Sequence, residues 1–371
     1  MSTTDGLELE QVQRWAARHG NETALRLLEA ERVADAIREM AQSANTNRTY
    51  DNGHDAWARF CAAHQLPPSE PTRGTLATYA AWLLTNGRKT PGPGGATGYA
   101  KTSAIAYLTG AIVRLRDQGC EISKKTAAEA YEALEAAHTK MVKDGVRVKG
   151  RGQAQHIDPA ALEQIVRATD TTPTGLRDRA LILMGWNLAA RASELAGLLA
   201  DDVDLTTRGM KVHILAGKTT HSVRSPAIAA DPTDPALCPV RAWTDWRQAL
   251  ALAEPERSAA TGAPAFHAID RWGNIGGGMS PQAVTNAIGR AADRAGIPVR
   301  VTEHSLRAGL ATAARDAGGD SLVIAEQGGW AKNSTAMLGY MRRADEYTDN
   351  AATLVRRAAQ QRRAQNDGQP L

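Results

Sequence analysis

One basic, glycine-containing segment near the middle of the chain limits how the whole sequence can fold. It reads KMVKDGVRVKGRGQAQH, residues 140–156, and its cations face a single acid, Asp144. The segment lacks the apolar period of a helix or a strand, so we predict an extended linker at residues 139–155. It is either an ordinary solvated tether or a strap along a phosphate backbone, with Arg147, Lys149 and Arg151 as contacts.

The residues before this linker predict a helical bundle. Apolar residues recur at three- and four-residue steps from residue 7 onward, and similar patterns cover 43–66, 72–87 and 101–142. We predict one helical domain at 1–138, in which residues 1 to about 40 form an N-terminal helical extension. The stretch RKTPGPGGATGY predicts a mobile loop. Its glycines do not follow a strand, which excludes a glycine-rich phosphate cradle.

Composition narrows the class of protein. The 371 residues are 43% hydrophobic, enough for a sizeable core. The formal net charge is only +4, but the sequence pI of about 9.0 favours an anionic partner. The three cysteines are scattered singly, so they predict neither a disulfide framework nor a metal site. The polar N-terminus does not resemble a signal peptide, and no apolar run is long enough to span a bilayer. We expect an intracellular, soluble protein with no cofactor and no membrane partner.

The second domain, residues 156–371, mixes two periods. A long apolar helical stretch at 175–203 has a break near Gly185 to Leu188. After it, apolar and polar residues alternate from 211 to 214, and a polar turn leads to Val223, which predicts a short hairpin with Lys218 near its tip. Helical patterns resume at Ser280 and continue to the C-terminus. The expected fold is mainly α-helical, with a small antiparallel β-sheet in the second domain.

Two arginine motifs in this domain are candidates for anion binding. Arg191 follows the helix break, and Glu194 lies three residues on. The pair can be an ordinary surface ion pair, but its flanks are apolar, and an arginine held there needs an anion. His304 and Arg307 lie one turn apart on one helix and can be a satisfied histidine and a surface arginine. Alternatively they converge on one phosphate, which the arginine fork binds and beside which histidine passes a proton.

Three further side chains complete a possible reaction site. Lys218 on the hairpin turn can be a common turn lysine or can protonate a leaving oxygen, and Lys211 is the weaker candidate. Trp330 and Tyr340 in GGWAKNSTAMLGYMRR can fill a core, or can serve as hydrogen-bond donor and nucleophile, with Tyr347 as the rival nucleophile. Together these residue types suit phosphodiester transfer, which needs cations, a proton donor and a nucleophile that stores the bond as a covalent intermediate.

This assembly resembles the tyrosine recombinase (phage integrase) family. Residues 177–205 look like its first catalytic box, GKTTHSVRSP like its catalytic hairpin, and the segments beginning at His304 and Gly328 like its second and nucleophile boxes. The region 43–120 looks like the helical, SAM-like core-binding domain of that family. One departure is the gap of ten positions from Trp330 to Tyr340, one longer than in the Cre and Xer proteins.

The resemblance implies a role for each matching residue. Arg191 and Arg307 clamp the scissile phosphate, and Lys218 is the general acid for the 5′ hydroxyl. His304 assists proton transfer at the tyrosine, Trp330 packs against or hydrogen-bonds the phosphate, and Tyr340 forms a 3′-phosphotyrosine link. Glu194 orients the site without reacting.

The same resemblance implies a site-specific DNA recombinase that integrates, excises, inverts or resolves DNA. Its partners are duplex DNA with inverted-repeat core sites, a homotetramer on two such sites, and an accessory directionality factor in some relatives. The helix in the tail after residue 348 docks on a neighbouring protomer, and the expected location is the bacterial cytoplasm at the nucleoid. Arg48, Lys101 and Ser103 are candidate DNA contacts of the bundle. The alternatives are type IB topoisomerase-like strand passage and a catalytically silent DNA-binding relative.

Overall fold

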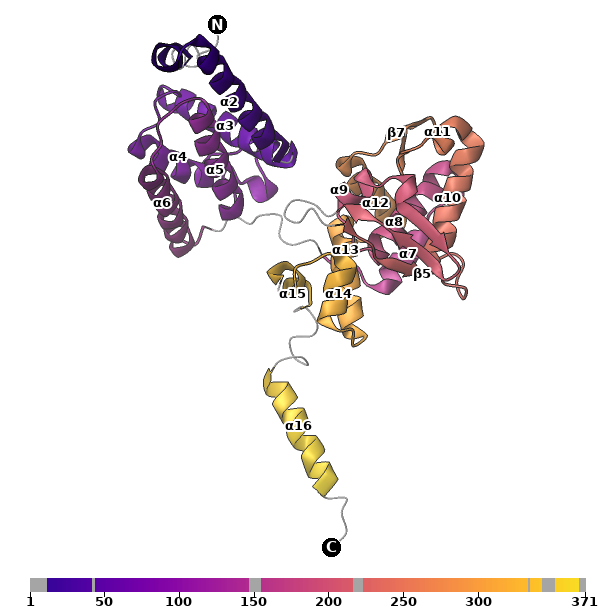
Figure 1. Cartoon of the computed structure of the whole chain (residues 1–371). Coiled ribbons are helices and arrows are strands. Elements are labelled where there is room, and N and C mark those ends of the chain that lie inside the picture. The colour runs from indigo at the N-terminus through magenta and orange to yellow at the C-terminus, as the bar shows by residue number, and fades with distance from the viewer. Residues whose placement is uncertain are drawn as a thin grey trace. The chain divides into compact units, whose positions relative to one another are not determined.

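The chain divides into two compact units, Met1–Gly152 and Gln153–Leu371, which are coloured from indigo to magenta and from magenta to yellow in Figure 1. The computed structural model describes residues 12–41, 44–146, 155–215, 223–332, 334–341 and 351–366. Its helices and small antiparallel sheets confirm the predicted fold class. None of the helices in these ranges is both long and apolar enough to cross a membrane.

Unit 1 is built from helices. Residues 12–19 are helical. The elements that follow are α2 (Asn21–Ala41), α3 (Ala44–His64), α4 (Arg73–Thr85), the short η1 (Pro93–Gly95), α5 (Lys101–Asp117) and α6 (Lys124–Lys143). Side-chain oxygens of Thr72 and Ser123 cap the first turns of α4 and α6. The core is aromatic, because Trp57, Phe60 and Tyr79 are fully buried and their rings meet at 5.3–5.6 Å.

Two details of unit 1 differ from the sequence-based expectation. Helix α6 continues to Lys143, so the predicted linker begins too early, since 139–143 are helical and Met141 packs against the core. The loop between α4 and α5 is tied rather than mobile. Its backbone is closed by hydrogen bonds from Arg88 to Thr97 (2.9 Å) and from Gly92 to Ala96 (2.8 Å).

Unit 2 surrounds one buried helix. Helix α8 (Pro173–Asn187) is covered by α7 (Pro159–Arg167), α10 (Pro239–Ala253), α12 (Pro281–Arg294) and α13 (Glu303–Asp316). This position explains why most of its residues are buried, including the charged residues Arg177 and Asp178 as well as the apolar run from Ala180 to Trp186. The remaining helical elements are α9 (Ala192–Gly197), η2 (Ala200–Asp202), α11 (Pro255–Ala259), α14 (Ser321–Gly328), α15 (Thr335–Met341) and α16 (Ala351–Asn366).

Among the described residues of unit 2 there are three small antiparallel sheets. β2 (Gly209–Val212) pairs with both β1 (Val203–Thr206) and β5 (Ala227–Ala229). The predicted hairpin consists of β3 (Ile214–Leu215) and β4 (Val223–Arg224), in register Ile214 to Arg224. A further hairpin, β6 (His267–Ile269) and β7 (Ile275–Gly278), and the helix α10 have no counterpart among the predicted elements.

Candidate active site

The site begins where α8 ends. Ala189 has a left-handed backbone (φ 44°), and the amides of Ala189 and Ala190 donate back to Trp186 (2.9 Å) and Gly185 (3.0 Å). This is a Schellman-type helix end with alanine where glycine is usual. The predicted break near Gly185 to Leu188 is therefore confirmed.

Carbonyl groups at this helix end accept hydrogen bonds from three distant side chains. Gln327 donates to the carbonyl of Asn187 (2.7 Å) and Arg224 to that of Leu188 (3.0 Å). Arg307 donates to the carbonyl of Ala189. The last carbonyls of a helix have no partner within the helix and carry partial negative charge, so this end attracts donors and cations.

Glu194 joins two arginines immediately beyond the helix end. It is 8% exposed and accepts from Nη1 (2.6 Å) and the amide (2.9 Å) of Arg191 and from Nη2 of Arg224 (2.8 Å). Burial opposes ionisation of Glu194, but Arg224 and Arg191 outweigh it, so its pKa lies below the usual value. The side chain of Arg191 is 45% exposed, so this guanidinium is held by a buried carboxylate and still reaches solvent.

Arg307 lies deeper, on α13. It is 3% exposed, and its Nη1 also donates to the carbonyl of Gly328 (2.7 Å). Nη2 is buried and has no hydrogen-bond partner among the described residues. Burial, with Arg191 and Arg224 nearby, lowers the pKa of Arg307 to about 9. A buried cation that has an unsatisfied N–H donor and lies close to other cations favours the binding of an anion at this position.

The turn after α14 sets the aromatic side of the site. The centroid of the Trp330 ring is 3.8 Å from Cζ of Arg307, a cation–π contact. Gly329 has a left-handed backbone (φ 61°), and a Cβ there would lie 2.8 Å from Cδ of Arg224. A Cβ on Gly328 would lie 1.9 Å from the Trp330 ring. Gly328 is therefore required for Trp330 to lie on Arg307, and Gly329 is required for the turn and for the close approach of Arg224.

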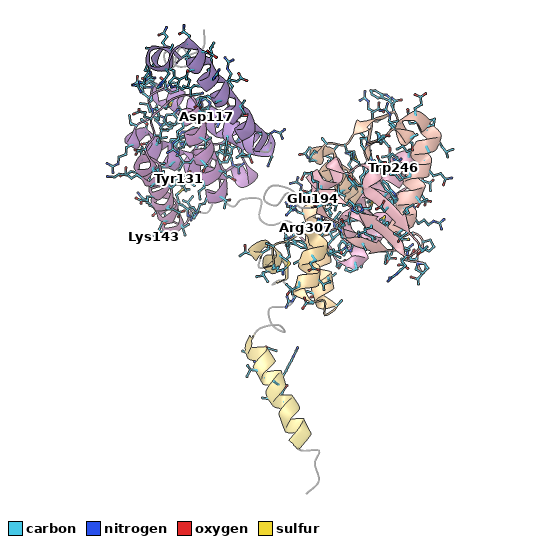
Figure 2. All side chains as sticks on the ribbon, in the orientation of Figure 1. Asp117, Tyr131, Lys143, Glu194, Trp246 and Arg307 are labelled. Carbon is cyan, nitrogen blue, oxygen red and sulfur yellow. The ribbon has the colours of Figure 1, made fainter. Side chains whose placement is uncertain are left out.

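Tyr340 lies next to this tryptophan. The two rings meet edge to face with centroids 6.3 Å apart, and Tyr340 is 9% exposed. Helix α15 is held to α13 by a hydrogen bond from Thr312 to the carbonyl of Tyr340 (3.3 Å) and by packing of Met337. The structure thus brings Arg191, Arg307, Trp330 and Tyr340 into one region, and Glu194 and Arg307 are labelled in Figure 2.

His304 lies in the first turn of α13. Its side chain is 55% exposed, whereas Arg307 one turn later is buried, and its Nδ1 is 3.0 Å from the Glu303 carboxylate. Burial opposes ionisation of Glu303, but hydrogen bonds from His304 and Thr285 outweigh it and lower the pKa of that carboxyl. The two residues, one turn apart on α13, therefore differ strongly in burial.

Other candidate residues are elsewhere. Lys218, Arg147, Lys149, Arg151 and Tyr347 lie outside the described residues. In unit 1, Arg48 is exposed on α3, Ser103 is half-buried in the first turn of α5, and Lys101 pairs with Glu135 at 2.6 Å. Within the described ranges, no group of three or more His, Cys, Asp or Glu side chains could hold a metal ion.

Comparison with known proteins identifies the family. Residues 155–346, just over half of the chain, match the Phage integrase family. The chain belongs to this family of tyrosine recombinases.

Two curated tyrosine recombinases are similar in sequence to this family member. "Tyrosine recombinase XerC" of Mycobacterium sp. (strain KMS) is 27% identical over 305 residues, 81% of this chain and 89% of that protein. "Tyrosine recombinase XerC 2" of Ralstonia nicotianae is 32% identical over 160 residues, only 43% of this chain and 41% of that protein. The crystal structure of lambda integrase (residues 75–356) bound to DNA has a TM-score of 0.51 at 15% identity and covers 85% of this chain and 96% of that one. This likeness supports the fold.

The integrase-like site contains one residue that our sequence analysis did not single out. Arg224 on β4 is half-buried, with its side chain 11% exposed, and it contacts Glu194, the carbonyl of Leu188 and the carbonyl of Gln327 (2.6 Å). It therefore connects the hairpin to α8, α9 and α14. The only sequence signal was an arginine two residues before Pro226 in a hairpin strand, and surface strands contain such arginines routinely.

Proposed function

We propose that this chain is a site-specific DNA recombinase that cuts and rejoins strands through a covalent 3′-phosphotyrosine intermediate. The observation that carries the proposal is a cluster in which Glu194 pairs with Arg191 and Arg224, while Arg307, close enough to feel the charge of both arginines, stacks on Trp330 beside Tyr340. It joins a fixed pair of cations to a phenol, which are the components that phosphoryl transfer to tyrosine needs.

In the proposed reaction, the DNA phosphate occupies the space beside the free nitrogen of Arg307 and the exposed guanidinium of Arg191. The Oη–P bond to Tyr340 forms as the P–O5′ bond breaks, and negative charge grows on the phosphoryl oxygens. The two arginines stabilise that charge. The interaction with Arg307 is stronger than it would be in water, because Arg307 is buried and the surrounding dielectric constant is low.

Two protons move in this step. The phenol proton of Tyr340 passes to His304 or through it to solvent, which the exposed position of that imidazole permits. Lys218 gives a proton to the leaving 5′ oxygen. Trp330 keeps the guanidinium of Arg307 in place by stacking, while Glu194 and Arg224 hold Arg191. The reverse sequence rejoins a new 5′ hydroxyl to the 3′ phosphate.

The proposed assembly is a homotetramer on two DNA sites with inverted-repeat core sequences. Helix α16 would dock on a neighbouring protomer, unit 1 would act as the core-binding domain, and the basic linker would follow the DNA backbone with Arg147, Lys149 and Arg151. Arg48, Lys101 and Ser103 remain proposed DNA contacts. The outcome would be integration, excision, inversion or resolution, with or without a directionality factor, in the bacterial cytoplasm at the nucleoid.

A nicked suicide substrate tests the chemistry. Such a duplex loses a short fragment after cleavage, so the enzyme stays attached to DNA and migrates as a covalent adduct on a denaturing gel. We expect an adduct with the wild-type chain and with Tyr347→Phe, and none with Tyr340→Phe, which should still bind the duplex. An adduct that persists in Tyr340→Phe would disprove the assigned nucleophile.

The same substrates separate the alternatives. Strand exchange between two intact sites identifies a recombinase, whereas relaxation of a single supercoiled molecule without exchange identifies a type IB topoisomerase-like enzyme. Binding without any adduct in the wild-type chain identifies a catalytically silent relative.

A further inference from the structure

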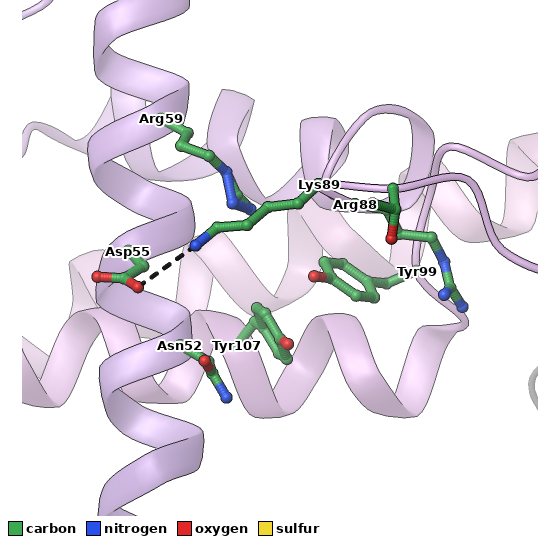
Figure 3. Close-up of a pocket in the computed structure, with 8 residues that line it drawn as sticks. Asn52, Asp55, Arg59, Arg88, Lys89, Tyr99 and Tyr107 are labelled. Carbon is green, nitrogen blue, oxygen red and sulfur yellow. Dashed lines mark ion pairs between the residues drawn. The ribbon is translucent and has the colours of Figure 1, made fainter.

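Unit 1 contains a basic pocket remote in sequence from the residues of the proposed reaction. It has a volume of about 270 Å³, at the lower end of small-molecule pockets. Figure 3 shows it between α3, α5 and the loop that precedes α5. The residues that line it are Asn52, Asp55, Arg59, Arg88, Lys89, Thr90, Tyr99 and Tyr107.

Arg59 supplies an unused donor at the wall of this pocket. Its Nη2 donates to the carbonyl of Gly87 (2.8 Å), which fixes the guanidinium plane. Its Nη1 is buried and has no hydrogen-bond partner within the described part of the chain. A buried charged donor left without an acceptor is unfavourable, so this nitrogen favours an anionic guest.

Two tyrosines form the floor. The rings of Tyr99 and Tyr107 are 4.4 Å apart, and Arg88 lies over the outer ring with its Cζ 5.2 Å from the Tyr99 centroid. Burial and a hydrogen bond with Tyr99 raise the pKa of Tyr107 to about 12, so its hydroxyl stays protonated at neutral pH. The floor therefore offers hydroxyl donors and no negative charge.

A weak ion pair between Lys89 and Asp55 lies at the solvent-exposed side of the pocket. Lys89 is 3.7 Å from the Asp55 carboxylate, and both side chains are more than half exposed. Exposed pairs of this kind contribute little, about 0–1 kcal/mol, so Lys89 can exchange this partner for another anion. Asp55 is the single carboxylate among the lining residues, against three cations.

We infer that this pocket binds a phosphate group, held by Arg59 and Lys89 with the tyrosine hydroxyls beneath it. A tetrahedral phosphate presents several acceptor oxygens at once, which matches the set of donors better than a carboxylate with two. The proposed donors are side chains rather than the backbone of the glycine-containing loop. The phosphate can belong to a DNA backbone or to a free nucleotide.

The test uses the full chain in the Tyr340→Phe background, which prevents covalent capture. Arg59→Met keeps the apolar stem and removes the charge. Lys89→Gln is the second pocket variant. Because Lys89 is exposed, this variant should fold normally even if thermal melting shows that Arg59→Met is unstable. Arg73→Met is the matched control, because Arg73 is an exposed arginine of unit 1 that pairs with Glu129 outside the pocket.

In the first arm, inorganic phosphate and adenosine monophosphate are titrated calorimetrically. If the phosphate is free, both bind saturably, and both pocket variants weaken binding by about tenfold, the factor that one charge-assisted hydrogen bond supplies. In the second arm, duplex DNA binding is measured against salt. If the phosphate belongs to DNA, each pocket variant lowers the slope of log K against log salt by about 0.9, and the control does not.

Either of these two results supports the inference and names the source of the phosphate. The inference is overturned if both pocket variants match the Arg73→Met control in both arms. Only the DNA arm rests on the proposed function. If the chain with Tyr340 intact forms no adduct with DNA, while Arg59→Met in the Tyr340→Phe background still loses phosphate binding, the recombinase proposal is refuted and the pocket proposal stands.

Discussion

Unit 2 buries two arginines in opposite ways. Arg177 on α8 is 2% exposed, and its guanidinium is fully used by the Asp178 carboxylate (2.6 and 3.0 Å) and the carbonyl of His267 (3.1 Å). Arg307 is equally buried, but it has two carbonyls, an indole face and one idle nitrogen.

This contrast distinguishes Arg177, whose hydrogen bonds are all made within the protein, from Arg307, which has a nitrogen available for a ligand. A buried ion pair with its hydrogen bonds satisfied needs nothing more, and removal of either partner is costly. A buried cation without a carboxylate lowers stability until an anion arrives, and that deficit can strengthen ligand binding. Four predictions test this difference.

The largest effect on stability is expected at the satisfied arginine. Arg177→Met leaves Asp178 buried with only the partly exposed Arg294, at 3.5 Å, and should lower the free energy of unfolding by about 3–5 kcal/mol. Urea denaturation measures the loss. The double variant Arg177→Met/Asp178→Leu should recover most of it, and a single variant as stable as wild type would remove the contrast.

The second effect is kinetic. Arg307→Met should slow adduct formation on the suicide substrate by about 10²–10³-fold, the usual loss for one preorganised donor to transition-state charge. Its unfolding free energy should fall by about 1–2 kcal/mol through the abandoned carbonyls of Ala189 and Gly328, less than for Arg177→Met. Equal destabilisation by the two substitutions would make Arg307 a structural residue as well.

A glycine substitution tests the indole face. Gly328→Ala places a methyl group against the Trp330 ring, and overpacking of this kind costs about 1–3 kcal/mol. The tryptophan should leave Arg307, which a changed emission spectrum of Trp330 would report in a chain whose other tryptophans are replaced by phenylalanine. Gly197→Ala is the control, since a Cβ there meets nothing within 4 Å.

The smallest expected effect is a loss of stability at acidic pH, which comes from His267, the residue whose carbonyl binds Arg177. Burial lowers the pKa of His267, whose carbonyl accepts from Arg177, so the folded chain keeps this imidazole neutral where the unfolded chain takes a proton. The free energy of unfolding should be highest above the ordinary histidine pKa of about 6.5, where His267 is neutral in both states. It should fall as the pH drops below that value, because only the unfolded chain then takes up the proton readily. His267→Asn should flatten thermal midpoints across this range; an unchanged slope would contradict the assignment.

The four residues that the structure brings together at the candidate site are easier to mark in the sequence than their surroundings. Arg191, Arg307, Trp330 and Tyr340 stand in recognisable motifs, and the helix break is marked by a change of pattern. Their convergence is a tertiary fact that local periodicity does not contain, and here it was implied by family resemblance alone.

The surroundings were hidden for physical reasons. Arg224 and Arg177 look like surface charges in the sequence, and only packing against other elements buries them. Ala189 occupies a left-handed position that favours glycine, so no local signal marks it. Helix α10 was overlooked although Trp243, Trp246 and Leu250 follow a helical spacing, and those side chains form part of the core.

The helix end at Asn187 to Ala189 also bears on the order in which the protein is made. Its three carbonyls are bound by side chains synthesised 36, 118 and 140 residues later. A chain still emerging from the ribosome therefore has α8 long before it has the two arginines and the glutamine that complete this helix end. The candidate site can form only after Tyr340 has been synthesised, so any product that stops earlier lacks its assembled set of side chains.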